Sequence, residues 1–122
     1  MATIQSNPGD AVTLATAQTG NADSTNTADR RGRGGGGAIV ITSTVGATPT
    51  VTVNIQGSVD GSAWFNIPYA LVATPRTFVV TAITITTAVT TTYLLQELVF
   101  YRYVKYVMSA NTNVTLTSTF HG

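Results

Sequence analysis

The chain has 122 residues and a mass of 12.7 kDa, which is enough for one small domain. Charged residues make up only 9% of it and the formal net charge is +1. This balance argues against a general binder of nucleic acid or of membrane surfaces, because either would need a broad basic field. The absence of cysteine excludes disulfides and thiolate metal sites.

Threonine accounts for about a fifth of the residues, several times its usual share. Polar strand faces are therefore expected to carry uncharged hydroxyls, and such a surface gives little charge repulsion between molecules. The first residues, MATIQSNPGD, lack the basic and apolar regions of a signal peptide, and no apolar run approaches the length of a membrane span. We expect a chain that is made in the cytoplasm and works inside an assembly.

Residues 1–37 contain no aromatic residue and end in the run RRGRGGGG. Only Ile4, Val12 and Leu14 could anchor this segment, which is too little apolar surface to repay the entropy of ordering a compact unit. We therefore predict an extended N-terminal arm that closes in a flexible glycine-rich hinge. Val12 to Leu14 could add one short strand to the sheet edge of a neighbouring subunit.

The clearest element is TVTVNIQGSVDGSAWFNI, residues 50–67, which predicts two strands and the turn between them. Apolar and polar residues alternate through its first half, as in a half-buried strand, and the inward set is Val51, Val53, Ile55 and Val59. Asp60-Gly61 is a dipeptide that two-residue type I′ hairpin turns prefer, because both central residues need φ > 0. The returning strand carries the only tryptophan, Trp64, which we expect in the core.

The rest of residues 38–122 predicts further short strands and no helix. Turns are expected at Gly46–Pro49 and Asn111–Asn113, an irregular edge at 69–74, and a strand with a bulge at 76–87. The last strand should turn Val114, Leu116 and Phe120 inward. The predicted fold is all-β: a single small β-sandwich or jelly-roll-like domain over 38–122, preceded by the arm over 1–37.

Catalytic chemistry has few candidates in this sequence. His121 is the sole histidine and stands one residue from the end, and both a serine triad and a histidine-based zinc site would depend on it. The five acidic residues show no paired spacing. Gly32, Gly34 and Gly37 match G-x-G-x-x-G by letter, but the strand and helix that this motif needs are not predicted around them. We expect no enzyme activity, cofactor, metal or small-molecule substrate.

Arg30, Arg31 and Arg33 are the main binding candidates of the arm. Arginine binds carboxylates bidentately, so this cluster could clamp acidic groups of a partner protein. A solvated linker is the simpler interpretation, and a nucleic-acid contact is the weaker one because no aromatic residues are interleaved. The predicted partner-binding residues of the arm are Ile4, Val12, Leu14, Arg30, Arg31 and Arg33.

A second candidate surface is the run Tyr101, Arg102, Tyr103 and Lys105. Together with Tyr106, these side chains could form an interface or a face on which sugars stack. The alternative is a strand whose aromatic residues are half buried and whose charges lie on the rim.

The chain thus combines a Thr-rich β domain of low charge, an arm ending in RRGRGGGG, and the hairpin VTVNIQGSVDGSAWFNI. Over about Arg31 to Phe120, this combination resembles small virion proteins of tailed bacteriophages, in particular head decoration (cement) proteins. The resemblance implies a structural protein on the capsid surface that binds the major capsid protein and its own copies, often as a homotrimer. It also implies an arm laid across neighbouring capsid subunits and no catalytic residues. A tail or fibre component, and a glycan- or receptor-binding module, are the alternatives.

Overall fold

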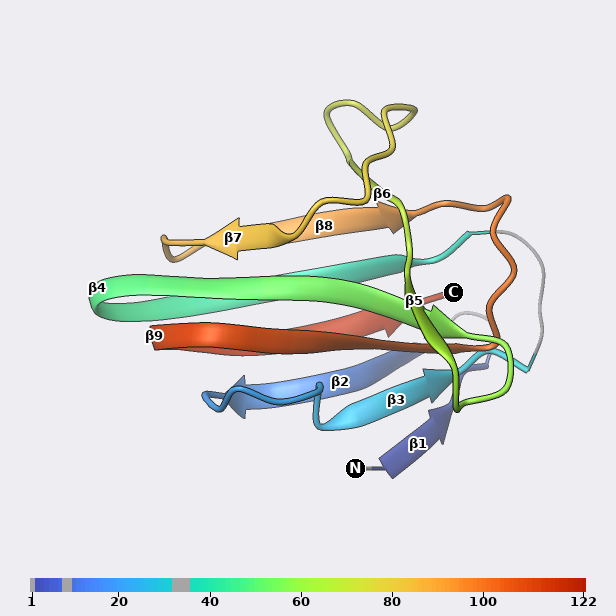
Figure 1. The fold of residues 1–122 in the computed structure, drawn as a ribbon, viewed down its shortest axis with the longest axis horizontal. Coiled ribbons are helices and arrows are strands. Elements are labelled where there is room, and N and C mark those ends of the chain that lie inside the picture. Colours follow the sequence, from blue (N-terminus) through green and yellow to red (C-terminus); the bar gives the residue numbers. More distant parts are fainter. Residues whose placement is uncertain (1, 8–9, 32–35) are drawn as a thin grey trace.

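The computed structural model describes residues 2–7, 10–31 and 36–122, and every regular element in these ranges is a β-strand (Figure 1). The prediction of an all-β fold is confirmed. Within the same ranges there is no helix long and apolar enough to cross a membrane. In chain order the strands are β1 (Ala2–Gln5), β2 (Ala11–Gln18), β3 (Asn26–Asp29), β4 (Ala38–Ser58), β5 (Trp64–Asn66), β6 (Tyr69–Leu71), β7 (Ile83–Ile85), β8 (Thr90–Leu95) and β9 (Tyr103–His121).

Two long strands, β4 and β9, organise the sheet. They pair antiparallel from Ala38 opposite His121 to Ser58 opposite Tyr103, and each doubles back near its middle (Figure 1). These bends are the turns that the sequence predicts at 46–49 and 111–113. They contact each other, because the Asn113 side-chain amide donates a hydrogen bond of 2.6 Å to the Ala47 carbonyl.

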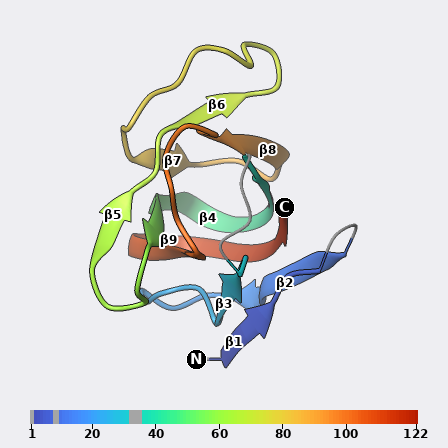
Figure 2. The same cartoon turned by 90° about the vertical axis from the view of Figure 1, so that its right-hand side faces the viewer.

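The bends divide one continuous nine-stranded sheet into two halves. β2, β8 and β6 extend the half that contains the first part of β4 and the last part of β9. β3, β1, β7 and β5 extend the other half, and Figure 2 shows β6 and β8 at one end of the strand order and β1 to β3 at the other. Side chains from both halves, such as Ile39, Leu116, Val53 and Tyr106, belong to one core. The two halves are therefore joined by β4 and β9, because both strands continue from one half into the other.

The N-terminal segment was predicted to be an extended arm, but its described strands join the sheet. β2 pairs with β9 of its own chain, with Val12 opposite Phe120, and β3 pairs with β9 through Ala28 opposite Val104. β1 then adds to β3 in parallel. The Leu14 side chain is completely buried. A few apolar residues are enough to hold this segment because they enter a core that the rest of the chain supplies.

The predicted hairpin is confirmed in its strands but wrong in its turn. β4 and β5 pair with Ser58 opposite Trp64, so residues 59–63 form the loop. Asp60 Oδ1 accepts hydrogen bonds from the backbone N–H groups of Ser62 (2.8 Å) and Ala63 (3.0 Å). Gly61 has a positive φ of 82° whereas Asp60 does not. Because the Asp60 side chain itself supplies the acceptor that orders the loop, a type I′ turn is not needed.

Three other expectations about the β domain are wrong. Trp64 is half-buried beside Lys105 and outside the core, and Val59 is 56% exposed in the hairpin loop. Residues 76–82 are not a strand: the segment makes one isolated bridge, Val79 with Tyr69, and only Ile83–Ile85 pairs with β4. High β-propensity at 76–82 is not sufficient, because a strand also needs a neighbouring strand in register.

Gly57 lies where β4 packs tightly against the core residues Ile67 and Tyr101. A Cβ at this position would come within 2.7 Å of Ile67 Cδ1 and 2.9 Å of Tyr101 Cβ. We expect Gly57→Ala to lower the free energy of unfolding by about 1–3 kcal/mol through overpacking, measured by urea denaturation. Gly20→Ala is the matched control, because a Cβ there meets nothing within 4 Å. Equal stability of the two variants would contradict this prediction.

Candidate functional site

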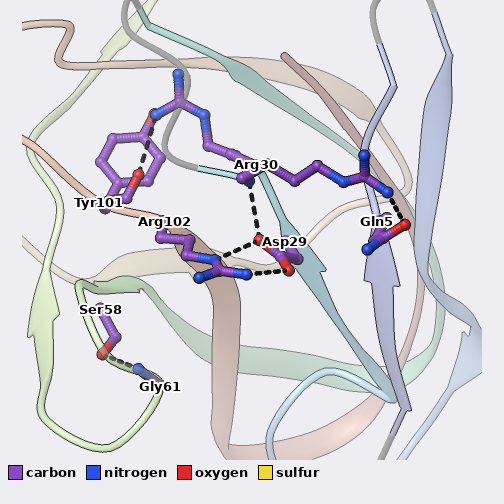
Figure 3. Close-up of polar contacts among 8 residues, drawn as sticks. Gln5, Asp29, Arg30, Ser58, Gly61, Tyr101 and Arg102 are labelled. Carbon is purple, nitrogen blue, oxygen red and sulfur yellow. Dashed lines mark hydrogen bonds and ion pairs between the residues drawn. The ribbon is translucent and has the colours of Figure 1, made fainter.

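The two binding candidates of the sequence meet in the structure, where Arg30 of the arginine cluster lies beside Tyr101 and Arg102 of the second run (Figure 3). They meet because β3 ends beside the start of β9, with Asp29 opposite Tyr103. Directly after β3, the backbone N–H of Arg30 donates a hydrogen bond of 2.8 Å to the carbonyl of Arg102. The site is therefore built from segments that are far apart in the sequence.

Asp29 is the centre of this site. Its Oδ1 accepts a hydrogen bond from Arg102 Nε (2.9 Å) and its Oδ2 accepts one from Arg102 Nη2 (3.1 Å). The backbone N–H of Arg31 also donates to Oδ1, at 2.8 Å. These contacts, above all the hydrogen bond from Arg102, lower the pKa of the Asp29 carboxyl. The bidentate clamp expected between two proteins is thus formed within one chain, and Arg102 makes it.

The described arginines of the N-terminal cluster have different environments. Arg30 is 2% exposed; its guanidinium lies 4.2 Å from the centroid of the Tyr101 ring, and its Nη1 donates to the Tyr101 carbonyl at 3.4 Å. Arg31 is exposed, and its guanidinium donates to the side-chain oxygen of Gln5. Arg33 lies outside the described residues. Arg30 is therefore part of the interior, whereas Arg31 reaches the surface.

The Tyr101–Lys105 run is also largely used within the chain. Tyr101 is fully buried, and this burial raises the pKa of its hydroxyl. Lys105 is 8% exposed and pairs with Asp23 at 2.7 Å between Nζ and Oδ2. Tyr103 is half-buried beneath Arg102, whose guanidinium carbon lies 5.0 Å from the ring centroid. Of the four predicted interface residues, Arg102 and Tyr103 keep the larger share of accessible surface.

The apolar anchors predicted for the arm also point inward. Val12 and Leu14 belong to the core, and Ile4 is partly buried against it. In this conformation Val12 and Leu14 have almost no surface to offer to a partner, since they are 3% and 0% exposed. Their role in the structure is to attach the N-terminal strands to the rest of the domain.

The histidine and the acidic residues considered for catalysis do not lie together in one site. His121 is exposed, and its Nε2 lies 2.9 Å from Thr119 Oγ1. Asp23 and Asp29 are each engaged by a cation, and Asp60 orders its own loop. Among residues 2–7, 10–31 and 36–122, no three histidine or acidic side chains are grouped so that they could hold a metal ion.

Sequence reasoning missed a set of large apolar side chains on the surface. Leu98 is 86% exposed and Phe100 is 56% exposed, both in the connection between β8 and β9. Others lie on β6, where the sequence predicts an irregular edge, and in the connection between β6 and β7, where Val79 and Val80 fall in a predicted strand. The sequence offered only a high proportion of β-branched residues in this region, and that proportion does not distinguish an exposed loop from a buried strand. Among the residues that the structure describes, this set is Val45, Val59, Leu71, Val72, Val79, Val80, Val89, Leu98 and Phe100.

The crystal structure of the SPBc2 prophage-derived protein YomS has a similar fold, with a TM-score of 0.62. The similar region covers 92% of this chain and 90% of that chain, and 7% of the residues are identical. The two proteins therefore share a fold over nearly their whole lengths. No protein-family model matches the sequence, and the curated proteins contain no significant match.

Proposed function

We propose that this chain is a structural protein of a bacteriophage particle, which works by binding its own copies and other virion proteins. The fold shared with a prophage-derived protein supports a phage origin. The observation that carries the structural role is the set of large apolar side chains exposed by a protein with 9% charged residues. Exposed apolar patches mark interaction sites, and a surface with few charges gives little repulsion against another protein.

Part of this set is held together by a defined loop geometry. Tyr69 and Val79 exchange two backbone hydrogen bonds of 2.9 Å, so the loop after β6 folds back along that strand. Val79 thereby lies opposite Tyr69, on the strand that ends with Leu71, and the side chains of Leu71, Val72, Val79 and Val80 are 40–60% exposed. We call these four residues the β6 apolar surface. Apolar side chains with few charges among them are typical of the central part of a protein–protein interface.

The more specific form of the proposal is a head decoration (cement) protein that forms a homotrimer on the capsid surface and binds the major capsid protein. In this mechanism many weak contacts act together, and linking several of them in one oligomer raises the effective concentration of each. The contacts come from the β6 apolar surface and from Leu98 and Phe100. In this proposal the described N-terminal strands, which are paired within the chain, stabilise the subunit.

Self-association can be tested on the purified chain. We expect a trimer in sedimentation analysis, and we expect Val72→Ser together with Val80→Ser to shift the population to monomer, because these side chains are 60% and 55% exposed in the subunit. Val59→Ser is the matched control, since Val59 is 56% exposed in the hairpin loop at a different place. A wild-type chain that sediments as a monomer at all accessible concentrations would contradict the homotrimer.

The location on the particle needs a second experiment. The gene is deleted from the phage or prophage that encodes it, and the purified chain is added back to the resulting heads. We expect regularly spaced additional density on the capsid by electron cryomicroscopy, and greater resistance of the heads to heating. Density on the tail would replace decoration with the tail or fibre alternative, and failure to bind any part of the particle would overturn the virion role.

A further inference from the structure

A hollow with a volume of about 430 Å³ lies between the hairpin loop, the N-terminal strands and the start of β9. Its wall contains Thr3 and Thr27 from one side and Asp60, Gly61, Trp64 and Tyr103 from the other, together with Asp29. Figure 3 shows the Ser58–Gly61 loop beside the Asp29–Arg102 pair in this region. The volume lies within the range of roughly 300–1,000 Å³ typical of small-molecule pockets.

The two aromatic residues of the hollow are held in position by cations of the same chain. Lys105 Nζ lies 4.3 Å from the centroid of the Trp64 ring, and the Arg102 guanidinium carbon lies 5.0 Å from that of Tyr103. Each cation is in turn paired with a carboxylate, Asp23 or Asp29. Both rings are only half-buried, so aromatic surface remains available in the wall of the hollow.

Asp60 offers a fixed hydrogen-bond acceptor at the same place. Its Oδ1 accepts from the backbone N–H groups of Ser62 and Ala63 and from the Ser58 hydroxyl. The backbone donors lower the pKa of this carboxyl, so it is ionised at neutral pH. A carboxylate with one oxygen anchored presents the other oxygen in a defined direction.

We propose that this hollow binds a neutral sugar residue of a glycan. The apolar face of the sugar ring would lie against Trp64 and Tyr103, and its hydroxyls would donate to the Asp60 carboxylate and exchange hydrogen bonds with the hydroxyl of Thr3, which is exposed. A cationic ligand fits less well, because Lys105 and Arg102 already lie over the two rings. A purely apolar ligand fits less well because it would take an ionised carboxylate out of water. This inference does not depend on the proposed virion role.

The chain contains a single tryptophan, so the fluorescence of Trp64 reports on this hollow without added labels. The full chain is titrated separately with maltotriose, lactose, tri-N-acetylchitotriose and, as a cationic competitor, tetralysine. We expect a saturable change in emission with at least one sugar. Asp60→Asn keeps an acceptor for the loop but removes the charge, and we expect it to weaken that binding about tenfold, because charge-assisted hydrogen bonds are roughly twice as strong as neutral ones.

Tyr103→Ala should abolish the same response, whereas Val89→Ala, which truncates an exposed apolar side chain elsewhere, should leave it unchanged. Circular dichroism of each variant checks that the fold is retained, and Asp60→Asn decides the question if Tyr103→Ala does not fold. No response to any sugar up to about 10 mM, a range that covers millimolar dissociation constants, would overturn the proposal. A response to tetralysine alone, or an unaltered sugar titration in Asp60→Asn, would also overturn it.

Discussion

Replacing Leu14 by alanine is expected to lower the free energy of unfolding by about 3 kcal/mol, within the range of about 2–5 kcal/mol for leucine-to-alanine changes in cores. Leu14 lies on β2 and is completely buried in the core that both halves of the sheet share. The substitution removes apolar contacts and leaves a cavity that the bent strands β4 and β9 cannot easily close. Urea denaturation followed by circular dichroism measures the change.

Leu98→Ala is the matched control for this experiment. Leu98 has the same side chain but is 86% exposed, so its truncation should change stability by less than about 0.5 kcal/mol. A large effect at Leu14 alone shows that the N-terminal strands belong to the folded domain. Similar small effects at both positions would instead favour the extended arm that the sequence pattern predicts.

Replacing Asp29 by alanine is expected to lower the free energy of unfolding by about 1–3 kcal/mol at pH 7, the usual cost of leaving the partners of a buried hydrogen-bonding group unsatisfied. The change leaves Arg102 and the Arg31 backbone N–H without their shared acceptor. We place the value below that of a fully buried ion pair because the Arg102 side chain is 45% exposed and water can solvate it. The substitution also removes the side-chain link between the end of β3 and the start of β9, while their backbone pairing remains.

The same variant makes a prediction about pH. The pKa of Asp29 is lower in the folded chain than its ordinary value, so its contribution to stability is present above the unfolded-state pKa of about 3.9 and is lost as the pH falls through the lower, folded-state pKa. Between pH 7 and pH 3, wild-type stability should therefore fall more steeply than that of Asp29→Ala. Gly20→Ala, which changes no titratable group and meets nothing within 4 Å, should keep the wild-type slope. Parallel profiles for wild type and Asp29→Ala would contradict the assigned role.

The positions of buried side chains within the long strands could be predicted from the sequence. Val51, Val53 and Ile55 are buried as their alternation indicates, and so are Val114, Leu116 and Phe120 on β9. Alternation is a local property, because successive side chains of any strand point to opposite faces. It fails at the ends of elements: Val59 continues the alternation in the sequence but lies in the hairpin loop, where the pleat no longer determines its direction.

The candidate site could be predicted only in part. The sequence singles out Arg30, Arg31 and the Tyr101–Lys105 run. It does not indicate that Asp29 joins these two segments. The Asp29–Arg102 pair spans 73 positions in the sequence, and it exists because β3 pairs with the start of β9. The hollow beside it likewise joins β1, β3 and the hairpin loop, none of which carries a recognisable ligand-binding motif by itself.

The sequence by itself determined that this protein is built of strands, where its two long strands bend, and which of their side chains face inward, since all three depend on neighbouring residues. Only the tertiary structure decided that the N-terminal segment joins the sheet, that Arg30 is buried, and that Leu98 and Phe100 are exposed. A strand such as β2 is weak alone and becomes stable only against the free edge of β9, about a hundred residues later in the chain. Burial and pairing at such distances are properties of the assembled sheet, which short-range patterns do not record.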